Sequence, residues 1–251
     1  QDFIERLRAI TGDIITDDER LAVYETDGLT AKKRLPGVVV IPDSIEQVQA
    51  ISALCQSFEV PLVPRGAGTG LSGGAMPHHE GVLLVMARFN QILDVDRSLR
   101  TATVQPGVTN LAITEAVADL GLYYAPDPSS QIACTIGGNV AENSGGVHCL
   151  KYGLTVHNVK QLKVVLPGGE LVVVGGKGYD TPGYDLLALM HGSEGMLGIV
   201  VEVIVQLLPK PPEVAVIMAA FSNVIDAANS VSGVISAGLL PAGLEMMDKL
   251  A

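Results

Sequence analysis

The chain has 251 residues, 48% of them apolar, and 16 basic against 27 acidic side chains give it a formal net charge of -11. A chain of this length and apolar content can bury the core of one large domain or two smaller ones, which excludes an intrinsically disordered protein. The negative charge repels a phosphate backbone, so we expect no nucleic-acid partner.

The cysteines and the opening of the sequence indicate a cytoplasmic protein. Cys55, Cys134 and Cys149 form no CxxC pair, so they predict neither a zinc site nor a disulfide framework, and no metal ligand set is visible elsewhere. The opening QDFIERLRAI lacks the apolar core of a signal peptide, and no run reaches the length of a transmembrane segment. Any membrane contact is expected to be peripheral, through partner subunits.

The first predicted elements form a strand-helix-strand unit. The β-branched run Val38 to Ile41 predicts a strand, and Ser44 with Gln47 three residues later is typical of a helix start. Apolar residues recur at helical spacing up to Phe58, and a second strand at Leu62 and Val63 follows Pro61.

Short strands and one helix are predicted in the middle of the chain. A helix is expected from about Thr109 to Leu120, ended by Gly121, and residues 126–130 (PDPSS) predict a rigid turn. The strands before that helix are expected at Val82–Met86, Ile92–Val95 and Thr101–Val104, and those after it at Val159–Leu166, Glu170–Val174 and Gly198–Leu208. Residues 167–169 (PGG) predict a hairpin turn between the first two of these later strands.

The proline cluster at residues 209–212 is the best candidate for a domain boundary, because it can continue neither a helix nor a paired strand. Beyond it the pattern predicts a strand at Val214–Phe221, a helix at about Val224–Ala237 and a strand start near Leu244. A unit of that size cannot bury a core alone, so we expect it to be the incomplete start of a second domain.

A first glycine-rich tract, residues 64–74 (PRGAGTGLSGG), directly follows a predicted strand. Its glycines allow several N–H groups to point to one place, which suits phosphate oxygens. A plain surface turn is one alternative. Another is the GxGxxG fingerprint of nicotinamide dinucleotides, which residues 68–73 match, with Asp94 as the ribose acid. That fingerprint needs a helix opening at its glycines, and Pro77 and Gly81 leave no room for one.

A second tract, residues 135–146 (TIGGNVAENSGG), supplies four more glycines. Two separate glycine-rich elements indicate a long ligand such as a dinucleotide, because a single phosphate would not require both. Two unrelated loops remain the alternative at this point.

These two tracts, with residues 126–130 (PDPSS) and 192–198 (GSEGMLG), resemble in sequence and order the FAD-binding domain of the vanillyl-alcohol oxidase and p-cresol methylhydroxylase class. The resemblance is greatest to the FAD-binding subunit of glycolate oxidase and to FAD-linked D-lactate and D-2-hydroxyglutarate dehydrogenases. It implies an α+β fold, with an FAD-binding domain at 1–209 made of two α/β subdomains (about 1–95 and 96–209). The first strand-helix-strand of an incomplete substrate-binding cap domain is then expected at 213–251.

The same resemblance implies the contacts of the cofactor. Residues 65–74 are expected to cradle the FAD pyrophosphate, 127–130 to line the cofactor channel, 137–146 to approach the flavin, and 194–199 to close the adenine end. The residues alone leave open whether Ile199 only packs in the core and whether Glu194 is only a helix-terminal carboxylate. The cofactor-binding residues so predicted are Pro64, Arg65, Gly66, Ala67, Gly68, Thr69, Gly70, Ser72, Gly73, Pro106, Gly107, Asp127, Pro128, Ser129, Ile136, Gly137, Gly138, Asn139, Ala141, Asn143, Ser144, Gly145, Gly146, Glu194, Gly198 and Ile199.

Function is likewise an expectation from the resemblance. It implies oxidation of a small 2-hydroxy acid to the 2-oxo acid by hydride transfer to FAD, with electrons passed to iron-sulfur and second flavin-domain partner subunits. The FAD is expected to be noncovalent, because Thr69 stands where some branches carry a flavin-linked histidine. The catalytic base is expected after Ala251, so this chain should be inactive alone, and His148 is a weak catalytic candidate near the flavin. The alternatives are a non-catalytic flavin-binding subunit and a flavin reductase on the same scaffold.

Overall fold

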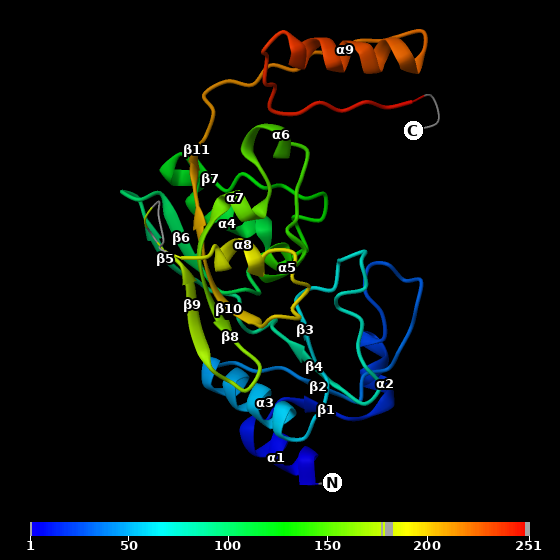
Figure 1. Cartoon of the computed structure of the whole chain (residues 1–251), viewed down its shortest axis with the longest axis vertical. Helices are drawn as coiled ribbons and strands as arrows, with labels where there is room; N and C mark the ends of the chain where they lie inside the picture. The colour runs from blue at the N-terminus through cyan, green and yellow to red at the C-terminus, as the bar shows by residue number, and fades with distance from the viewer. Residues whose placement is uncertain (1, 177, 179–182, 249–251) are drawn as a thin grey trace.

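The computed structural model describes residues 2–176, 178 and 183–248, whose two larger sheets are arranged along the long axis of the molecule (Figure 1). The first sheet lies near the N-terminus, and the second lies between it and the C-terminal segment. The change from one sheet to the other occurs between Val85 and Ile92, slightly before the subdomain boundary expected at about residue 95.

The first sheet has four strands in the order β1-β2-β4-β3, of which β2, β4 and β3 are parallel. Its side chains are buried on both faces: Val38 and Val40 belong to one apolar cluster and Val39 to another, as expected for parallel strands that are covered on both sides. The strands are β1 (Ile14–Ile15), β2 (Val38–Val40), β3 (Leu62–Arg65) and β4 (Val82–Val85).

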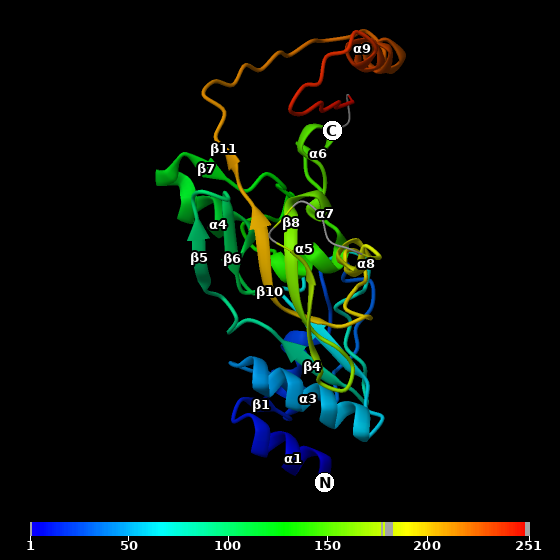
Figure 2. The same cartoon turned by 60° about the vertical axis from the view of Figure 1, so that its left-hand side comes forward.

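Helix α3 (Ile45–Ser57) begins where the sequence predicted, because the Ser44 hydroxyl accepts a hydrogen bond from the Gln47 N–H at 3.3 Å. Its side chains Val48, Ile51 and Cys55 are buried against the sheet. Helix α1 (Asp2–Ile10) lies on the outer side of α3 (Figures 1 and 2). The predicted strand-helix-strand unit is therefore confirmed.

The second sheet is antiparallel, with the strand order β5-β6-β10-β8-β9. The predicted hairpin joins β8 to β9, and its turn places Gly168 at a φ of 91°, which disfavours residues with a Cβ. Helix α4, followed by the 3-10 turn η2, packs on this sheet with α5 through Ile113, Val117 and Val140. The elements are β5 (Ile92–Asp96), β6 (Thr101–Val104), α4 (Asn110–Val117), η2 (Ala118–Leu120), β8 (Val159–Val165), β9 (Leu171–Gly175) and β10 (Ile199–Gln206).

The second glycine-rich tract is a helix rather than a loop. Thr135 caps helix α5 (Ile136–Glu142) by accepting the Gly138 N–H at 3.3 Å, and Ile136 and Val140 are buried beneath it. Residues 66–81, which comprise most of the first tract and the connection to β4, form neither helix nor strand, as predicted. A hydroxyl cap followed by apolar residues four apart thus makes a helix here despite two glycines in its first turn.

Short elements complete the described chain. Strands β7 (Leu122–Tyr123) and β11 (Leu208–Pro209) pair with each other and form a two-stranded sheet beside the larger one. The others are α2 (Asp18–Leu21), η1 (Ala22–Tyr24), α6 (Cys149–Tyr152), α7 (Thr155–Asn158) and α8 (Leu186–Met190). Every helix within the described residues is too short or too polar to cross a bilayer.

Beyond β11, the segment 213–248 extends away from both sheets and carries helix α9 (Val224–Ser236) (Figures 1 and 2). The predicted helix is present. The strands expected at Val214–Phe221 and near Leu244 are not formed in the described chain, because no described strand lies beside them to pair with. Ile217 and Met218 accordingly remain 93% and 95% exposed. Residues 249–251, the end of the expected unit, lie outside the described residues.

Candidate functional site

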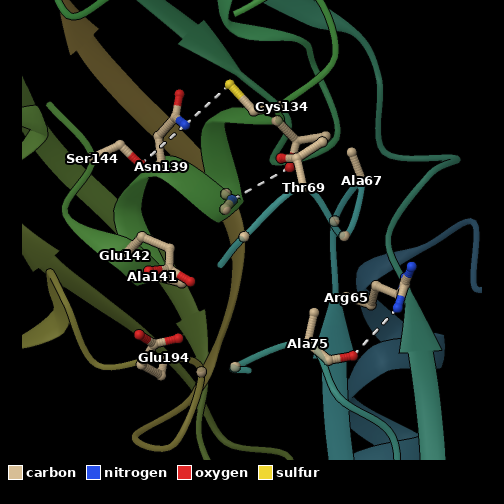
Figure 3. Close-up of a pocket in the computed structure, with 18 of the residues that line it drawn as sticks. Arg65, Ala67, Thr69, Ala75, Cys134, Asn139, Ala141, Glu142, Ser144 and Glu194 are labelled. Carbon is tan, nitrogen blue, oxygen red and sulfur yellow. Dashed lines mark hydrogen bonds between the residues drawn. The ribbon is translucent and has the colours of Figure 1, made fainter. Parts of the chain in front are cut away.

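A cavity of about 680 Å³ lies between the first glycine-rich tract, helix α5 and the loop that precedes β10 (Figure 3). Segments that are far apart in the sequence therefore form its walls: 64–75, 128–130, 134–145 and 193–200. This volume is within the range of about 300 to 1,000 Å³ for cofactor and small-molecule sites. The two tracts face the same cavity, as a shared ligand requires.

The main-chain N–H groups of the first tract differ from those of the helices and sheets in their hydrogen bonding. Within the described part of the chain, none of the main-chain N–H groups of residues 66–75 donates a hydrogen bond to a protein acceptor. Gly68 adopts a φ of 72°, a left-handed conformation that a side chain would strain. A row of donors without protein partners beside a cavity must be satisfied by water or by a ligand.

Arg65, which ends β3, is buried (9% exposed) beneath this tract. Its guanidinium Nη1 donates to the carbonyl oxygens of Thr26 at 2.8 Å and Ala75 at 3.4 Å (Figure 3). Burial lowers the pKa of Arg65, whereas the charges of Asp27 and Tyr24 raise it. The side chain thus ties the ends of the tract to the Tyr24–Asp27 segment.

The second tract meets the first at Gly66, where an added Cβ would lie 2.2 Å from the Thr135 Oγ1. Behind this contact, the buried Asn139 side chain accepts a hydrogen bond from Asn110 Nδ2 at 2.9 Å and donates to the Ser144 Oγ at 3.4 Å. These hydrogen bonds join the middle of the tract to helix α4 on one side and to the end of the tract on the other. They explain how a segment rich in small residues forms a rigid cavity wall.

Two carboxylates, Glu142 at the end of α5 and Glu194 before β10, lie on the wall opposite Arg65 in Figure 3. Glu142 Oε2 accepts a hydrogen bond from the Ser72 Oγ at 3.1 Å, which joins the two tracts directly. Burial raises the pKa of Glu194, and the charge of Glu142, a hydrogen bond to it and the charge of Asp27 raise it further. Among the described residues that line the cavity, Arg65 supplies the only full positive charge.

Most of the predicted cofactor-binding residues line this cavity, including both residues whose alternatives the sequence left open, Glu194 and Ile199. Ile199 also packs in the core of the first sheet, so it serves both purposes. The predicted residues that do not line it are Gly73, Gly107, Asp127, Ile136 and Gly146.

Each of these five has a different neighbourhood. Ile136 is fully buried in the core, and Gly107 lines a separate, smaller cavity beside Ala67. Gly73 is in the tract at a φ of 85°, where its carbonyl accepts the Met76 N–H. The remaining two, Asp127 and Gly146, pack against each other.

His148, the weak catalytic candidate, forms a hydrogen bond with Asp127, with 2.5 Å between its Nδ1 and the carboxylate Oδ2. The pair joins the PDPSS segment to the end of the second tract. Neither side chain lines the cavity, and 44% of the His148 side chain is exposed. The structure therefore gives His148 a fixed orientation but no place inside the cavity.

Five further lining residues lie within the expected ranges but were not singled out by the sequence: Leu71, Gly74, Ser130, Glu142 and Gly195. The lining residues outside those ranges, which the sequence did not predict, are Ala75, Met86, Cys134, Thr135, Ser193 and Val200. Thr135 was within reach, because a threonine before small and apolar residues is a helix-cap signal. With α5 recognised, Glu142 follows as the residue one helical turn after Asn139 and facing the same side. Met86 and Val200 carry no such signal.

Comparison with known proteins identifies the family. The glycolate oxidase subunit GlcD of Escherichia coli (strain K12) is 59% identical over 239 residues, which cover 95% of this chain and 48% of that protein. The D-lactate dehydrogenase of Anaerostipes hadrus is 37% identical over 246 residues, covering 96% of this chain and 50% of that protein. The chain thus spans about half the length of the curated relatives it matches.

A solved structure of alkyldihydroxyacetonephosphate synthase shares the fold, with a TM-score of 0.81 at 23% identity over 96% of this chain and 48% of that one. The family model described as FAD binding domain matches residues 36–175, from strand β2 through both glycine-rich tracts to β9. Because this match spans more than half of the chain, the chain belongs to the FAD binding domain family.

Proposed function

We propose that the cavity between the two glycine-rich tracts binds FAD, and that the intact protein oxidises a small 2-hydroxy acid of the glycolate or D-lactate type to the 2-oxo acid. The observation that carries the cofactor site is the row of N–H groups at residues 66–75 that have no acceptor within the described chain. The relatives named glycolate oxidase subunit and D-lactate dehydrogenase support the substrate class.

The residues present fit a long, doubly phosphorylated cofactor. The N–H groups of residues 66–75 would hold the pyrophosphate, residues 128–130 and 137–145 would surround the flavin portion, and residues 194–199 would close the adenine end. Charge-assisted hydrogen bonds are worth roughly 1.5 to 3 kcal/mol each, so several together offset the negative charge of the chain. Bound FAD supplies the electron acceptor, and the chain's own residues orient it and exclude water.

We propose that the cofactor is held without a covalent bond, because Thr69 stands at the place in the first tract where some branches of the resembling class carry a flavin-linked histidine. Acid precipitation of the yellow protein is expected to leave the flavin in the supernatant. Flavin absorbance that stays with the precipitate would contradict this proposal.

The domain organisation and partners belong to the same proposal. Residues 1–209 would form the FAD-binding domain, and residues 213–251 would begin a substrate-binding cap. Iron-sulfur and second flavin-domain subunits would receive the electrons in the cytoplasm and provide any peripheral contact with the inner membrane. Affinity purification from the native host, followed by identification of the co-purifying chains, tests this arrangement.

The cofactor proposal is tested by titrating FAD into apoprotein and following the flavin absorption and fluorescence. Gly70→Asp places a carboxylate beside the N–H groups of the first tract and is expected to weaken FAD binding at least about tenfold, the loss of one such hydrogen bond. The matched control is Gly12→Asp, since nothing lies within 4 Å of a Cβ at Gly12. Equal FAD affinity of the two variants would place the cofactor elsewhere.

A further inference from the structure

The carboxylates of Glu142 and Glu194, called the carboxylate pair below, lie directly against the first glycine-rich tract. A Cβ added to Gly70 would be 2.8 Å from Glu142 Oε1, and one added to Gly74 would be 1.9 Å from Glu194 Oε2. The carboxylate pair therefore borders residues 70–74, which belong to the row of N–H groups at 66–75 that have no acceptor within the described chain. Negative side chains and anion-binding donors share one end of the cavity.

The charges around the carboxylate pair do not neutralise it. The first tract contributes the neutral Ser72 hydroxyl, and β3 contributes Arg65, whose Nη1 is held by the carbonyls of Thr26 and Ala75. The N-terminal loop contributes Asp27, which is 4% exposed and whose Oδ2 has no hydrogen-bond partner within the described residues. The charge of Asp27, like that of Glu142, raises the pKa of Glu194.

The elements that flank Glu194 add no cation either. His191, three residues before it, is buried, and its Nδ1 lies 2.7 Å from the Leu187 carbonyl oxygen, to which it donates. Burial lowers the pKa of His191, which favours the neutral ring. The pyrophosphate of a dinucleotide would thus enter a site with two carboxylates on its wall and one cation turned toward carbonyl oxygens.

We propose that the carboxylate pair holds one proton when FAD is bound, so that binding of the cofactor takes up a proton from the solvent. This inference rests on the proposed function, because it needs the diphosphate in this cavity. Two carboxylates that share a site do not both ionise readily, and a nearby anion adds to the cost. One protonated carboxyl in the pair also becomes a hydrogen-bond donor beside the phosphate oxygens.

The sign of the pH dependence follows from the direction of the shift. The carboxyl that gains a proton has a higher pKa in the FAD-bound protein than in the free protein. FAD affinity is therefore constant at pH values below the pKa of the free protein and constant again above the pKa of the FAD-bound protein. Between these two pKa values it weakens by about tenfold per pH unit. The weakening begins above the ordinary glutamate pKa of about 4.3.

Isothermal titration calorimetry measures the proton directly. FAD is titrated into apoprotein in acetate and in MES buffer at one pH, roughly one to two units above that ordinary value. The difference in heat between the buffers, divided by the difference in their ionisation enthalpies, gives the protons taken up. We expect about one proton per FAD bound in that window. Equal heats in the two buffers would overturn the proposal.

Variants assign the proton to the pair. Glu194→Gln and Glu142→Gln each remove the shared proton while keeping the shape, so both should bind FAD with no proton uptake and with an affinity independent of pH in the window. Glu46→Gln, at an exposed site in the first turn of α3, is the matched control and should take up as many protons as the unmodified protein. Uptake that persists in both pair variants would also overturn the assignment.

The two proposals fail in different ways. If the apoprotein binds no FAD in either buffer, the proposed function fails and this inference with it. If FAD binds tightly with no proton uptake, only this inference fails. Riboflavin, which lacks the diphosphate, provides a last check: wherever it binds, its heat should not depend on the buffer.

Discussion

The two glycine-rich tracts look alike in the sequence, yet the chain builds them in opposite ways. The first, residues 64–74, is an irregular loop from residue 66 onward, held by the Arg65 guanidinium and by a close approach of Gly28. A Cβ added to Gly28 would lie 2.6 Å from the Thr69 carbonyl oxygen and 2.9 Å from that of Gly70. The second, residues 135–146, is held from within by a capped helix and by the hydrogen bonds of Asn139. The N–H groups of the loop have no acceptor among the residues that the structure describes, whereas the helix uses most of its own.

This difference teaches that glycine content does not by itself determine a loop. Where a hydroxyl cap and spaced apolar residues accompany the glycines, as at Thr135, Ile136 and Val140, a helix forms and the glycines permit close approach of another segment. Gly137 shows this use, because a Cβ there would lie 2.6 Å from Pro106. Where these signals are lacking, the chain depends on distant side chains for its shape.

The largest effect is expected from Arg65→Met, which removes the external support of the first tract. The carbonyls of Thr26 and Ala75 lose their donor, and the buried Asp27 loses a nearby positive charge. We therefore expect the free energy of unfolding to fall by roughly 2 to 4 kcal/mol. Urea denaturation measures it. Arg88→Met is the control, because Arg88 is half-exposed and its ion pairs with Asp13 and Asp43 are worth less than about 1 kcal/mol. Equal losses in both variants would show that Arg65 does not hold the tract.

Gly68→Ala is expected to lower the free energy of unfolding by a smaller amount, about 2 kcal/mol. The new Cβ would meet the Arg65 Nη2 at 2.2 Å, and the φ of 72° disfavours alanine. Gly12→Ala is the control, since a Cβ at Gly12 meets open space and its φ is not in the left-handed region. Thermal denaturation of the two variants under the same conditions compares their stabilities. A Gly68→Ala protein as stable as the Gly12→Ala control would mean that the first tract readily adopts another conformation.

Thr135→Ala tests the internal support of the second tract and should cost about 1 kcal/mol, the usual contribution of a helix cap. Thr135→Ser keeps the hydroxyl and should restore most of the stability. Both are measured by urea denaturation, and the interpretation of α5 as a capped helix is wrong if serine and alanine destabilise equally.

The smallest effect is expected from Ser72→Ala, which removes the direct hydrogen bond between the tracts. Ser72 is exposed, so the free energy of unfolding should change by no more than about 0.5 kcal/mol. Ser57→Ala, which removes another exposed hydroxyl bond, is a suitable comparison. A loss above 1.5 kcal/mol, again by urea denaturation, would show that the two tracts depend on each other more than their separate supports imply.

Local signals predicted the elements well. Ser44 marked the start of α3, the β-branched run at residues 38–40 marked a buried strand, and Pro167 with Gly168 marked the hairpin. These features succeed because each depends on neighbours within a few residues. The four motifs also indicated the family, since their order along the chain is preserved.

The remaining features depend on contacts that no local pattern encodes. The sequence does not show that the Arg65 side chain turns to Thr26 and Ala75, since both carbonyls belong to the backbone. Nor does an apolar run such as Val214–Phe221 form a strand unless another strand lies beside it. Glu142 lies in the range 137–146 that was expected to approach the flavin, but the sequence did not single it out, because its place on the wall follows only once α5 is known to be a helix.

The small sheet of β7 and β11 has a mechanical consequence. Strand β11 connects the second sheet to the segment that carries α9, and it pairs with Leu122 and Tyr123, which lead directly into the Pro128–Ser130 wall of the cavity. Gly243, far along that segment, lies against Val147 and His148, which follow closely after the 134–145 wall of the cavity. A displacement of the C-terminal segment would therefore be transmitted to the cavity walls through two contacts. The position of this segment is thus coupled to the geometry of the site where the cofactor would lie.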